Sequence, residues 1–91
     1  MKEKICGIYC IENLVNGKRY IGQSVDIQQR FYDHQSRLRN NKHSNEHLQN
    51  AWNQYKEDNF SFYVLQRCNV EELDDLESYY IDYYNLTVSV I

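Results

Sequence analysis

The alternation of apolar and polar positions in the first quarter of the chain predicts a β-hairpin from Cys6 to Ser24. Its two strands carry the runs Gly7-Ile8-Tyr9 and Tyr20-Ile21-Gly22, and the dipeptide Asn16-Gly17 lies between them. Asn-Gly between two alternating apolar runs is the strongest short-range hairpin signal that a sequence offers. We therefore expect the first two strands to pair antiparallel.

The length of the hairpin loop decides which residues face each other. A four-residue loop from Leu14 to Gly17 pairs Tyr9 with Gly22, and a two-residue loop shifts that pairing. In both registers Tyr9 and Tyr20 share one face of the sheet, because strand side chains alternate, whereas a three-residue loop separates them. We expect the shared face to look outward at a binding partner. Ordinary strand tyrosines are the alternative, since tyrosine favours sheets.

Further along the chain, apolar residues recur first at helical spacing, then in a strand-like run, and then at helical spacing again. The expected order is β-β-α-α-β-α, an α+β fold with a small three-stranded antiparallel sheet flanked by helices. The predicted elements are a first helix capped by Ser24 and ending near Arg39, a second from Ser44 to about residues 56–59, a third strand over 60–68, and a last helix capped by Asn69 with Glu72.

The 91-residue chain contains no proline and no low-complexity stretch, so we expect residues 1–91 to form a single domain. The tail 86–91 alternates apolar and polar residues, and it either adds an edge strand or is the cut end of a longer protein. No apolar run is long enough to cross a membrane, and three cysteines without paired spacing favour a reducing compartment. We expect a cytoplasmic protein of a bacterial or phage-infected cell.

The net charge of −3 excludes a globally basic coat for nucleic acid, but the charges are unevenly distributed. Residues 18–42 hold six basic and two acidic side chains, whereas residues 71–82 hold six acidic side chains and no lysine or arginine. A protein with one basic side can hold a phosphate backbone there. Two solvated faces of opposite sign are the alternative.

Polar side chains interrupt the apolar stripes of two predicted helices. Arg30, His34 and Arg37 lie at i, i+4 and i+7, hence on one side of the first helix. Glu77 lies within or beside the buried stripe of the last helix, where an uncompensated charge costs several kcal/mol. Some partner must therefore compensate Glu77.

Each of these side chains also has a structural explanation. Arg30 can form a surface pair with Asp26 or Asp33 one turn away, and His34 can be a hydrogen-bonded histidine at the edge of the core. A zinc site at His43 and His47 lacks a third ligand.

Taken in order, these residues resemble the GIY-YIG nuclease domain. The two tripeptides of the hairpin are separated by ten residues, Arg30 follows eight positions later, and Glu77 stands on the last helix. The resemblance spans Ile5 to about Asn85. Gln23-Ser24 and the spacing from His34 to His43 are most similar to the catalytic domains of homing and phage-type endonucleases.

The resemblance implies a metal-dependent DNA endonuclease that leaves 5′-phosphate and 3′-hydroxyl ends with little sequence specificity of its own. By resemblance, Glu77 anchors a single Mg²⁺ or Mn²⁺, Arg30 binds the scissile phosphate, and Tyr9 orients or deprotonates the attacking water. The implied catalytic residues are Tyr9, Tyr20, Arg30, His34 and Glu77, and the expected substrate contacts are Lys18, Arg37 and His43.

Two departures from the family pattern leave alternatives open. Family members carry a supporting asparagine after the last helix, and this chain has no asparagine beyond Asn85. Homing members also append a separate DNA-binding module, so we expect this domain to be fused to one or assisted by one. The alternatives are a structure-specific repair or recombination nuclease, and a DNA-binding module that has lost activity.

Overall fold

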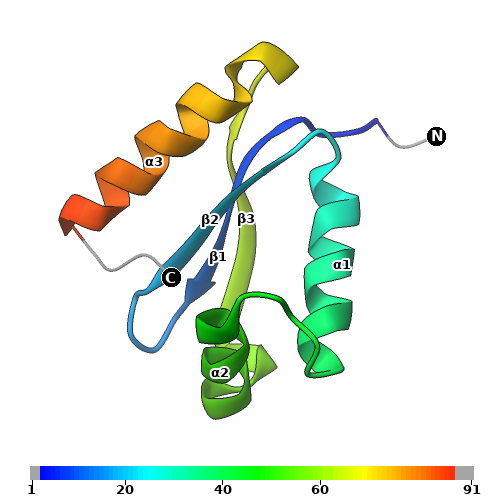
Figure 1. The fold of residues 1–91 in the computed structure, drawn as a ribbon, viewed down its shortest axis with the longest axis vertical. Helices are drawn as coiled ribbons and strands as arrows, with labels where there is room; N and C mark the ends of the chain where they lie inside the picture. Colours follow the sequence, from blue (N-terminus) through cyan, green and yellow to red (C-terminus); the bar gives the residue numbers. More distant parts are fainter. Residues whose placement is uncertain (1–2, 88–91) are drawn as a thin grey trace.

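The computed structural model describes residues 3–87 and shows a three-stranded antiparallel sheet, in the order β2-β1-β3, between helices (Figure 1). The predicted α+β class and the order β-β-α-α-β-α are confirmed. Short 3₁₀ turns precede β3 and α3. The elements are β1 (Gly7–Asn13), β2 (Arg19–Ser24), α1 (Ile27–Arg39), α2 (Glu46–Tyr55), β3 (Phe60–Arg67) and α3 (Leu73–Thr87).

The hairpin adopts the register of the four-residue loop. The backbone N–H of Gly17 donates to the carbonyl of Asn13, and Gly17 has a φ of 76°, a conformation that glycine adopts without steric cost. Tyr9 consequently lies opposite Gly22, and Tyr20 lies opposite Ile11. The turn thus places both tyrosines on one face of the sheet, as one of the sequence-derived registers predicts.

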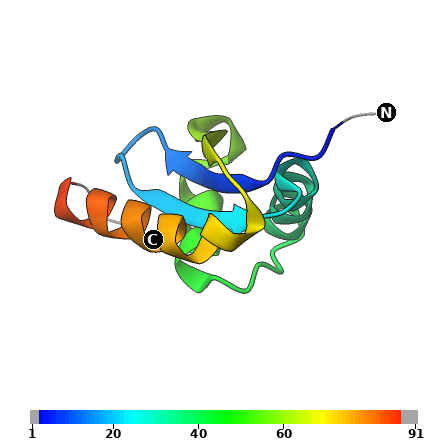
Figure 2. The same cartoon turned by 90° about the horizontal axis from the view of Figure 1, so that it is seen from above.

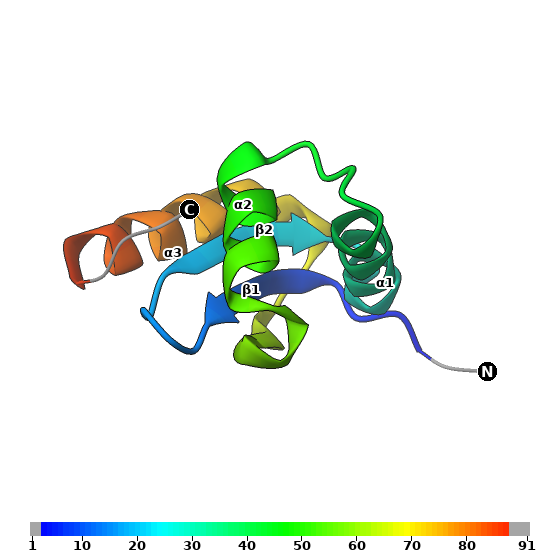
Figure 3. The ribbon, with the colours of Figure 1, turned by 90° about the horizontal axis from the view of Figure 1, so that it is seen from below.

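Two apolar layers form because successive side chains of β1 point to opposite faces of the sheet. The views in Figures 2 and 3 show α1 and α3 on opposite sides of the strands, and Figure 3 shows α2 lying across β1 and β2. One layer joins the sheet to α1 and α2 through Tyr9, Ile11, Ile27, Leu38, Leu48, Trp52 and Phe60. The other joins it to α3 through Ile8, Cys10, Ile21 and Leu73.

The prediction that the tyrosine face looks outward is wrong for Tyr9. This side chain is only 2% exposed, and its ring packs edge-on against Phe31 with ring centroids 5.4 Å apart. The helices α1 and α2 must bury their own apolar stripes, and the tyrosine face of the sheet is the surface that they cover. Tyr20, on edge strand β2, remains half-buried.

The caps of α1 and α2 lie one or two residues later than predicted. Ser24 remains in β2, where its hydroxyl accepts the N–H of Asp26, and the Asp26 carboxylate caps α1. Asn45, rather than Ser44, caps α2. The predicted pairing of Asn69 with Glu72 is confirmed, as a reciprocal capping box just before α3.

The backbone of α3 continues to Thr87, so residues 86 and 87 are helical, while the rest of the predicted edge strand at 86–91 lies outside the described residues. Asn85 therefore stands within α3 rather than after it. Within residues 3–87, no helix is both long enough and apolar enough to span a membrane.

Candidate active site

A cavity of about 420 Å³ opens along β2, at the edge of the sheet between α1 and α3. Four predicted site residues from four different elements line it: Tyr9 from β1, Tyr20 from β2, Arg30 from α1 and Glu77 from α3. Two phenols, a guanidinium and a carboxylate thus surround one space that is open to solvent.

The missing side chain of Gly22 lets the buried phenol of Tyr9 reach this cavity. Gly22 lies directly opposite Tyr9 on the neighbouring strand, and a Cβ built there would overlap the ring and hydroxyl of Tyr9. The glycine of the YIG tripeptide is therefore required by the close approach of a side chain rather than by its own φ. It gives Tyr9 a path between the strands.

Glu77 reaches the same cavity from the opposite apolar layer, and the amide of Gln23 compensates its charge in part. The Nε2 of Gln23 donates to Glu77 Oε1 at 3.3 Å and to Asp74 Oδ1 at 2.8 Å. Asp74 is one turn before Glu77 and is exposed, whereas Glu77 is half-buried. One amide group thus lies between two carboxylates at the rim of the cavity.

A second cavity, of about 260 Å³, adjoins the first and shares Tyr20 and Arg30 with it. The exposed Arg37 adds a second guanidinium to this space. Two arginines with only one carboxylate make the space suited to an anion. Its other lining residues are Asp33, His34, His43 and Ser44.

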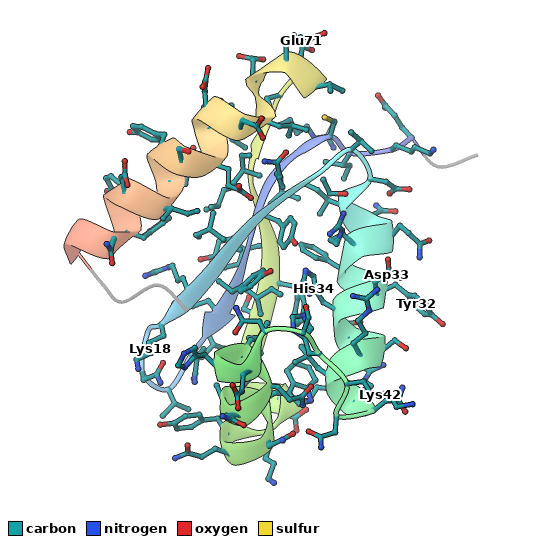
Figure 4. The ribbon with its side chains drawn as sticks, viewed as in Figure 1. Lys18, Tyr32, Asp33, His34, Lys42 and Glu71 are labelled. Carbon is teal, nitrogen blue, oxygen red and sulfur yellow. The ribbon has the colours of Figure 1, made fainter. Side chains whose placement is uncertain are left out.

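Three side chains form a continuous hydrogen-bonded chain between the cavities. The hydroxyl of Tyr9 lies 2.7 Å from Nε2 of His34, and Nδ1 of His34 lies 2.7 Å from Nε2 of His43. The backbone N–H of Asn45 donates to Nδ1 of His43 at 3.0 Å. Figure 4 shows His34 pointing from α1 toward the sheet, while Tyr32 on the same helix points to solvent.

Burial keeps the three hydrogen-bonded side chains, Tyr9, His34 and His43, uncharged at neutral pH. It raises the pKa of Tyr9, as does the nearby Tyr20, and the attraction of Arg30 offsets only part of this. Burial, followed by the repulsion of His43 and Arg30, lowers the pKa of His34 to about 4. Burial and Arg37 lower the pKa of His43 as well. At neutral pH the phenol is protonated and the buried imidazole of His34 is neutral.

Lys18 is not part of either cavity. It lies exposed on the turn between β1 and β2, at the tip of the hairpin in Figure 4, far along the sheet from His34. The alternative prediction that Arg30 pairs with Asp26 or Asp33 is wrong. The ion pairs of the described residues are Arg19–Glu12 and Arg39–Glu57. Arg30 is thus left facing the two cavities.

The donor set around Glu77 fits Mg²⁺ or Mn²⁺ held mainly by water and phosphate. Among residues 3–87, no group of three or more His, Cys, Asp or Glu side chains could hold a metal ion. Mg²⁺ retains several waters and usually takes only one or two carboxylates together with substrate phosphates. Glu77, with Asp74 beside it, supplies these carboxylates next to an open cavity.

Sequence reasoning assigned no role in the site to Gln23, Asp74 or Gln49. Asp74 precedes Glu77 by three residues, so helical spacing alone places it on the same side of α3. Gln23 lies two residues after Ile21 and so shares its face of β2, toward α3, but its pairing with Glu77 joins residues 54 apart. Buried Gln49 accepts the N–H of His43 and donates to the carbonyl of Leu38.

This fold and cavity are those of a nuclease domain. The sequence model of the GIY-YIG catalytic domain matches residues 5–88, so the chain belongs to the GIY-YIG family and the predicted resemblance is confirmed.

The chain is similar to proteins of the homing type. It is 36% identical over 86 residues to "Probable intron-encoded endonuclease 1" of Neurospora crassa, an alignment that covers 87% of this chain but only 27% of that relative. It also matches the solved catalytic domain of homing endonuclease I-TevI, with a TM-score of 0.84, 26% identity, and 94% and 97% of the two chains covered. A point mutant of the same catalytic domain gives a TM-score of 0.81 at 26% identity over 89% and 84% of the chains.

Proposed function

We propose that this GIY-YIG nuclease domain is a metal-dependent DNA endonuclease that leaves 5′-phosphate and 3′-hydroxyl ends. The observation that carries the proposal is the convergence of Tyr9, Arg30 and Glu77 on one open cavity from three separate elements. Phosphodiester hydrolysis needs an oriented water, a cation for the phosphate oxygens and help for the leaving oxygen. The cavity offers a group for each need.

Arg30 is suited to the scissile phosphate because its planar guanidinium stays charged at any working pH. It lines both cavities, so its several N–H donors can contact a phosphate in the first cavity and a neighbouring one in the second. Of the two cavities, Arg37 and His43 line only the second. The proposed role of Arg37 is to hold the adjoining phosphate of the same strand, whereas both ring nitrogens of His43 already form hydrogen bonds within the protein.

Glu77 would hold the metal ion, with Asp74 near enough to bind its water shell. When bound, Mg²⁺ or Mn²⁺ supplies positive charge for the scissile phosphate and for the departing 3′ oxygen. The amide of Gln23 contacts only Oε1 of Glu77, so the other carboxylate oxygen would be free to hold an ion.

Tyr9 acts in this proposal as a hydrogen-bond donor that orients the water or a phosphate oxygen. Burial raises its pKa above the ordinary value, which works against deprotonation of the phenol at neutral pH. Water adds to phosphorus and loses a proton, the bond from phosphorus to the 3′ oxygen breaks, and that oxygen takes up a proton. Tyr9 therefore contributes position rather than basicity.

The charges of the two flanking helices give the DNA strand one direction of approach. The exposed face of α3 is acidic, with Asp74, Asp75 and Asp82, and repels phosphate. The exposed Arg30 and Arg37 project from α1 on the other side of the cavity. The proposed path of the backbone therefore follows α1.

The target sequence is proposed to be selected by a separate DNA-binding module. The chain spans 27% of the length of its Neurospora crassa relative, which leaves room in a protein of that kind for such a module.

Nicking of supercoiled plasmid with Mg²⁺ or Mn²⁺ tests the proposal. The Arg30→Ala and Glu77→Ala variants should each lose about 100-fold or more in rate, and chelation of the metal should abolish nicking. Arg39→Ala is the matched control, because Arg39 is on the same helix but is exposed and paired with Glu57.

Nicking that survives both cavity substitutions would overturn the assignment of the site. Absence of metal-dependent nicking by the wild-type chain would favour the DNA-binding module that has lost activity. Cleavage of branched DNA in preference to plain duplex would favour the structure-specific nuclease.

A further inference from the structure

The hydrogen bonds that link Asn45, His43, His34 and Tyr9 all donate in one direction. That direction is set by the backbone N–H of Asn45. A peptide N–H only donates, so the N–H of Asn45 requires a lone pair on Nδ1 of His43. A neutral imidazole with a lone pair on Nδ1 carries its hydrogen on Nε2. His43 must therefore donate from Nε2 to Nδ1 of His34, 2.7 Å away.

The same reasoning passes to the next ring. Because Nδ1 of His34 accepts from His43, its single hydrogen must be on Nε2, which lies 2.7 Å from the hydroxyl oxygen of Tyr9. His34 then donates to that oxygen. The hydrogen of the Tyr9 hydroxyl is left free to point elsewhere, and the phenol lines the cavity where Gly22 leaves it uncovered.

The opposite direction places two donors against each other. If Tyr9 donated to His34, then His34 would donate to Nε2 of His43, and the hydrogen of His43 would face the N–H of Asn45. Turning either ring by 180° would replace each nitrogen of these contacts with carbon and break two hydrogen bonds. The direction from Asn45 to Tyr9 is thus the one that satisfies every partner.

We infer that His43 is a positioning residue: it fixes His34 in the Nε2–H tautomer, so that Tyr9 presents its hydroxyl hydrogen to the cavity. The consequence for DNA cleavage rests on the proposed function, whereas the tautomer does not. In this arrangement His34 cannot receive the proton of Tyr9, because the facing nitrogen already carries a hydrogen.

Two further contacts keep His43 in place. Gln49 is 7% exposed, and its Oε1 accepts the backbone N–H of His43 at 3.0 Å. Its Nε2 donates to the carbonyl of Leu38 at 3.0 Å, so one side chain fastens the connection between α1 and α2 to the end of α1. The rings of His43 and His34 are also nearly parallel, with centroids 5.0 Å apart and 20° between their planes, as an in-plane hydrogen bond between them requires.

The test is a long-range ¹H–¹⁵N correlation spectrum of the ¹⁵N-labelled full chain at pH 7, which distinguishes the two imidazole tautomers and needs neither DNA nor metal. We expect the Nε2–H pattern for both His34 and His43. An Nδ1–H pattern for His34 would overturn the inference in the wild-type protein, even if cleavage is normal. The Nε2–H pattern with no cleavage would refute only the proposed function.

Variants of His43 test the catalytic consequence. His43→Leu removes the donor, so His34 should lose its pure Nε2–H pattern and kcat should fall by roughly 10-fold to 100-fold with little change in KM. His43→Gln keeps a side-chain N–H of similar reach and should restore part of both. His47→Leu is the control, because His47 is an exposed residue of α2. A folded His43→Leu variant with wild-type kcat, or a Gln variant no better than Leu, would contradict the role of His43.

Discussion

Gly22→Ala should displace the phenol of Tyr9 and stop cleavage without unfolding the domain. The added Cβ would overlap the hydroxyl and Cζ of Tyr9 and would lie 2.9 Å from its Cε2. The ring cannot simply turn aside, because Phe31 packs against it and His34 holds its hydroxyl. The substitution must therefore break the contact with His34 or spread β1 from β2.

The size of the effect on stability follows from overpacking. Extra carbon in a filled core costs typically about 1 to 3 kcal/mol, and the smaller conformational freedom of alanine in the unfolded chain returns about 0.5 kcal/mol. We expect the free energy of unfolding to fall by about 0.5 to 2.5 kcal/mol. The rate of nicking should fall about 100-fold, because Tyr9 no longer reaches the cavity.

Gly17→Ala provides the matched comparison. Gly17 has a φ of 76° and no atom within 4 Å of an added Cβ, so alanine costs only backbone strain, roughly 1 kcal/mol. Urea unfolding should therefore give similar losses for the two variants, whereas plasmid nicking should separate them. Gly17→Ala should cleave at close to the wild-type rate.

A Gly22→Ala variant that nicks plasmid as fast as Gly17→Ala would refute this reasoning. It would mean that the position of the Tyr9 hydroxyl is irrelevant to cleavage. The double variant Gly22→Ala with Tyr9→Phe gives an independent check, because the second substitution should cost little once the first has displaced the phenol. Additive losses would show that the two residues act separately.

Three further predictions concern other parts of the molecule. The pKa of His34 is lowered to about 4 from 6.5, so the unfolded chain binds more protons between these values and the free energy of unfolding should fall by about 2 kcal/mol from pH 7 to pH 5; urea unfolding of the wild type and of His34→Gln should differ in this pH dependence, and equal slopes would contradict it. Gly7→Ala places a Cβ against the carbonyl of Gln66 and 3.0 Å from the Cα of Arg67, so it should separate β1 from β3 and lower stability by about 3 kcal/mol or more, whereas an unchanged Tm would be inconsistent with this pairing. Arg37→Ala should reduce the slope of log K for DNA against log salt concentration by about 1, while Arg39→Ala leaves it unchanged, and identical slopes for the two variants would remove Arg37 from the path of the DNA.

Local chemistry was enough to predict the hairpin and the last cap. Asn16-Gly17 locates the turn, and in the two-residue and four-residue registers the period of two places Tyr9 and Tyr20 on one face. The reciprocal bonds of Asn69 and Glu72 involve only neighbours in sequence. The starts of α1 and α2 could not be fixed in this way. Ser24 and Asp26 are both good capping residues, and the choice between them depends on how far β2 extends along β1.

The depth of Tyr9 and the partners of Glu77 could not be predicted, because both depend on packing between distant segments. Period-two alternation places Tyr9 on a face but does not show that α1 and α2 cover that face. The amide of Gln23 meets Glu77 only because α3 lies along β2. The hydrogen bond between His34 and His43 likewise forms only because α1 packs beside the connection that precedes α2. No period in the sequence predicts that packing.

The candidate site depends on both apolar layers at once. Tyr9 belongs to the layer under α1 and α2, whereas Glu77 is carried by α3, whose buried Leu73 packs in the opposite layer. Neither layer alone brings a phenol and a carboxylate to the same cavity, and β2 is the strand across which they meet. Gly22 of β2 therefore links the fold to the site, because the space above it lets Tyr9 reach the cavity that Glu77 lines.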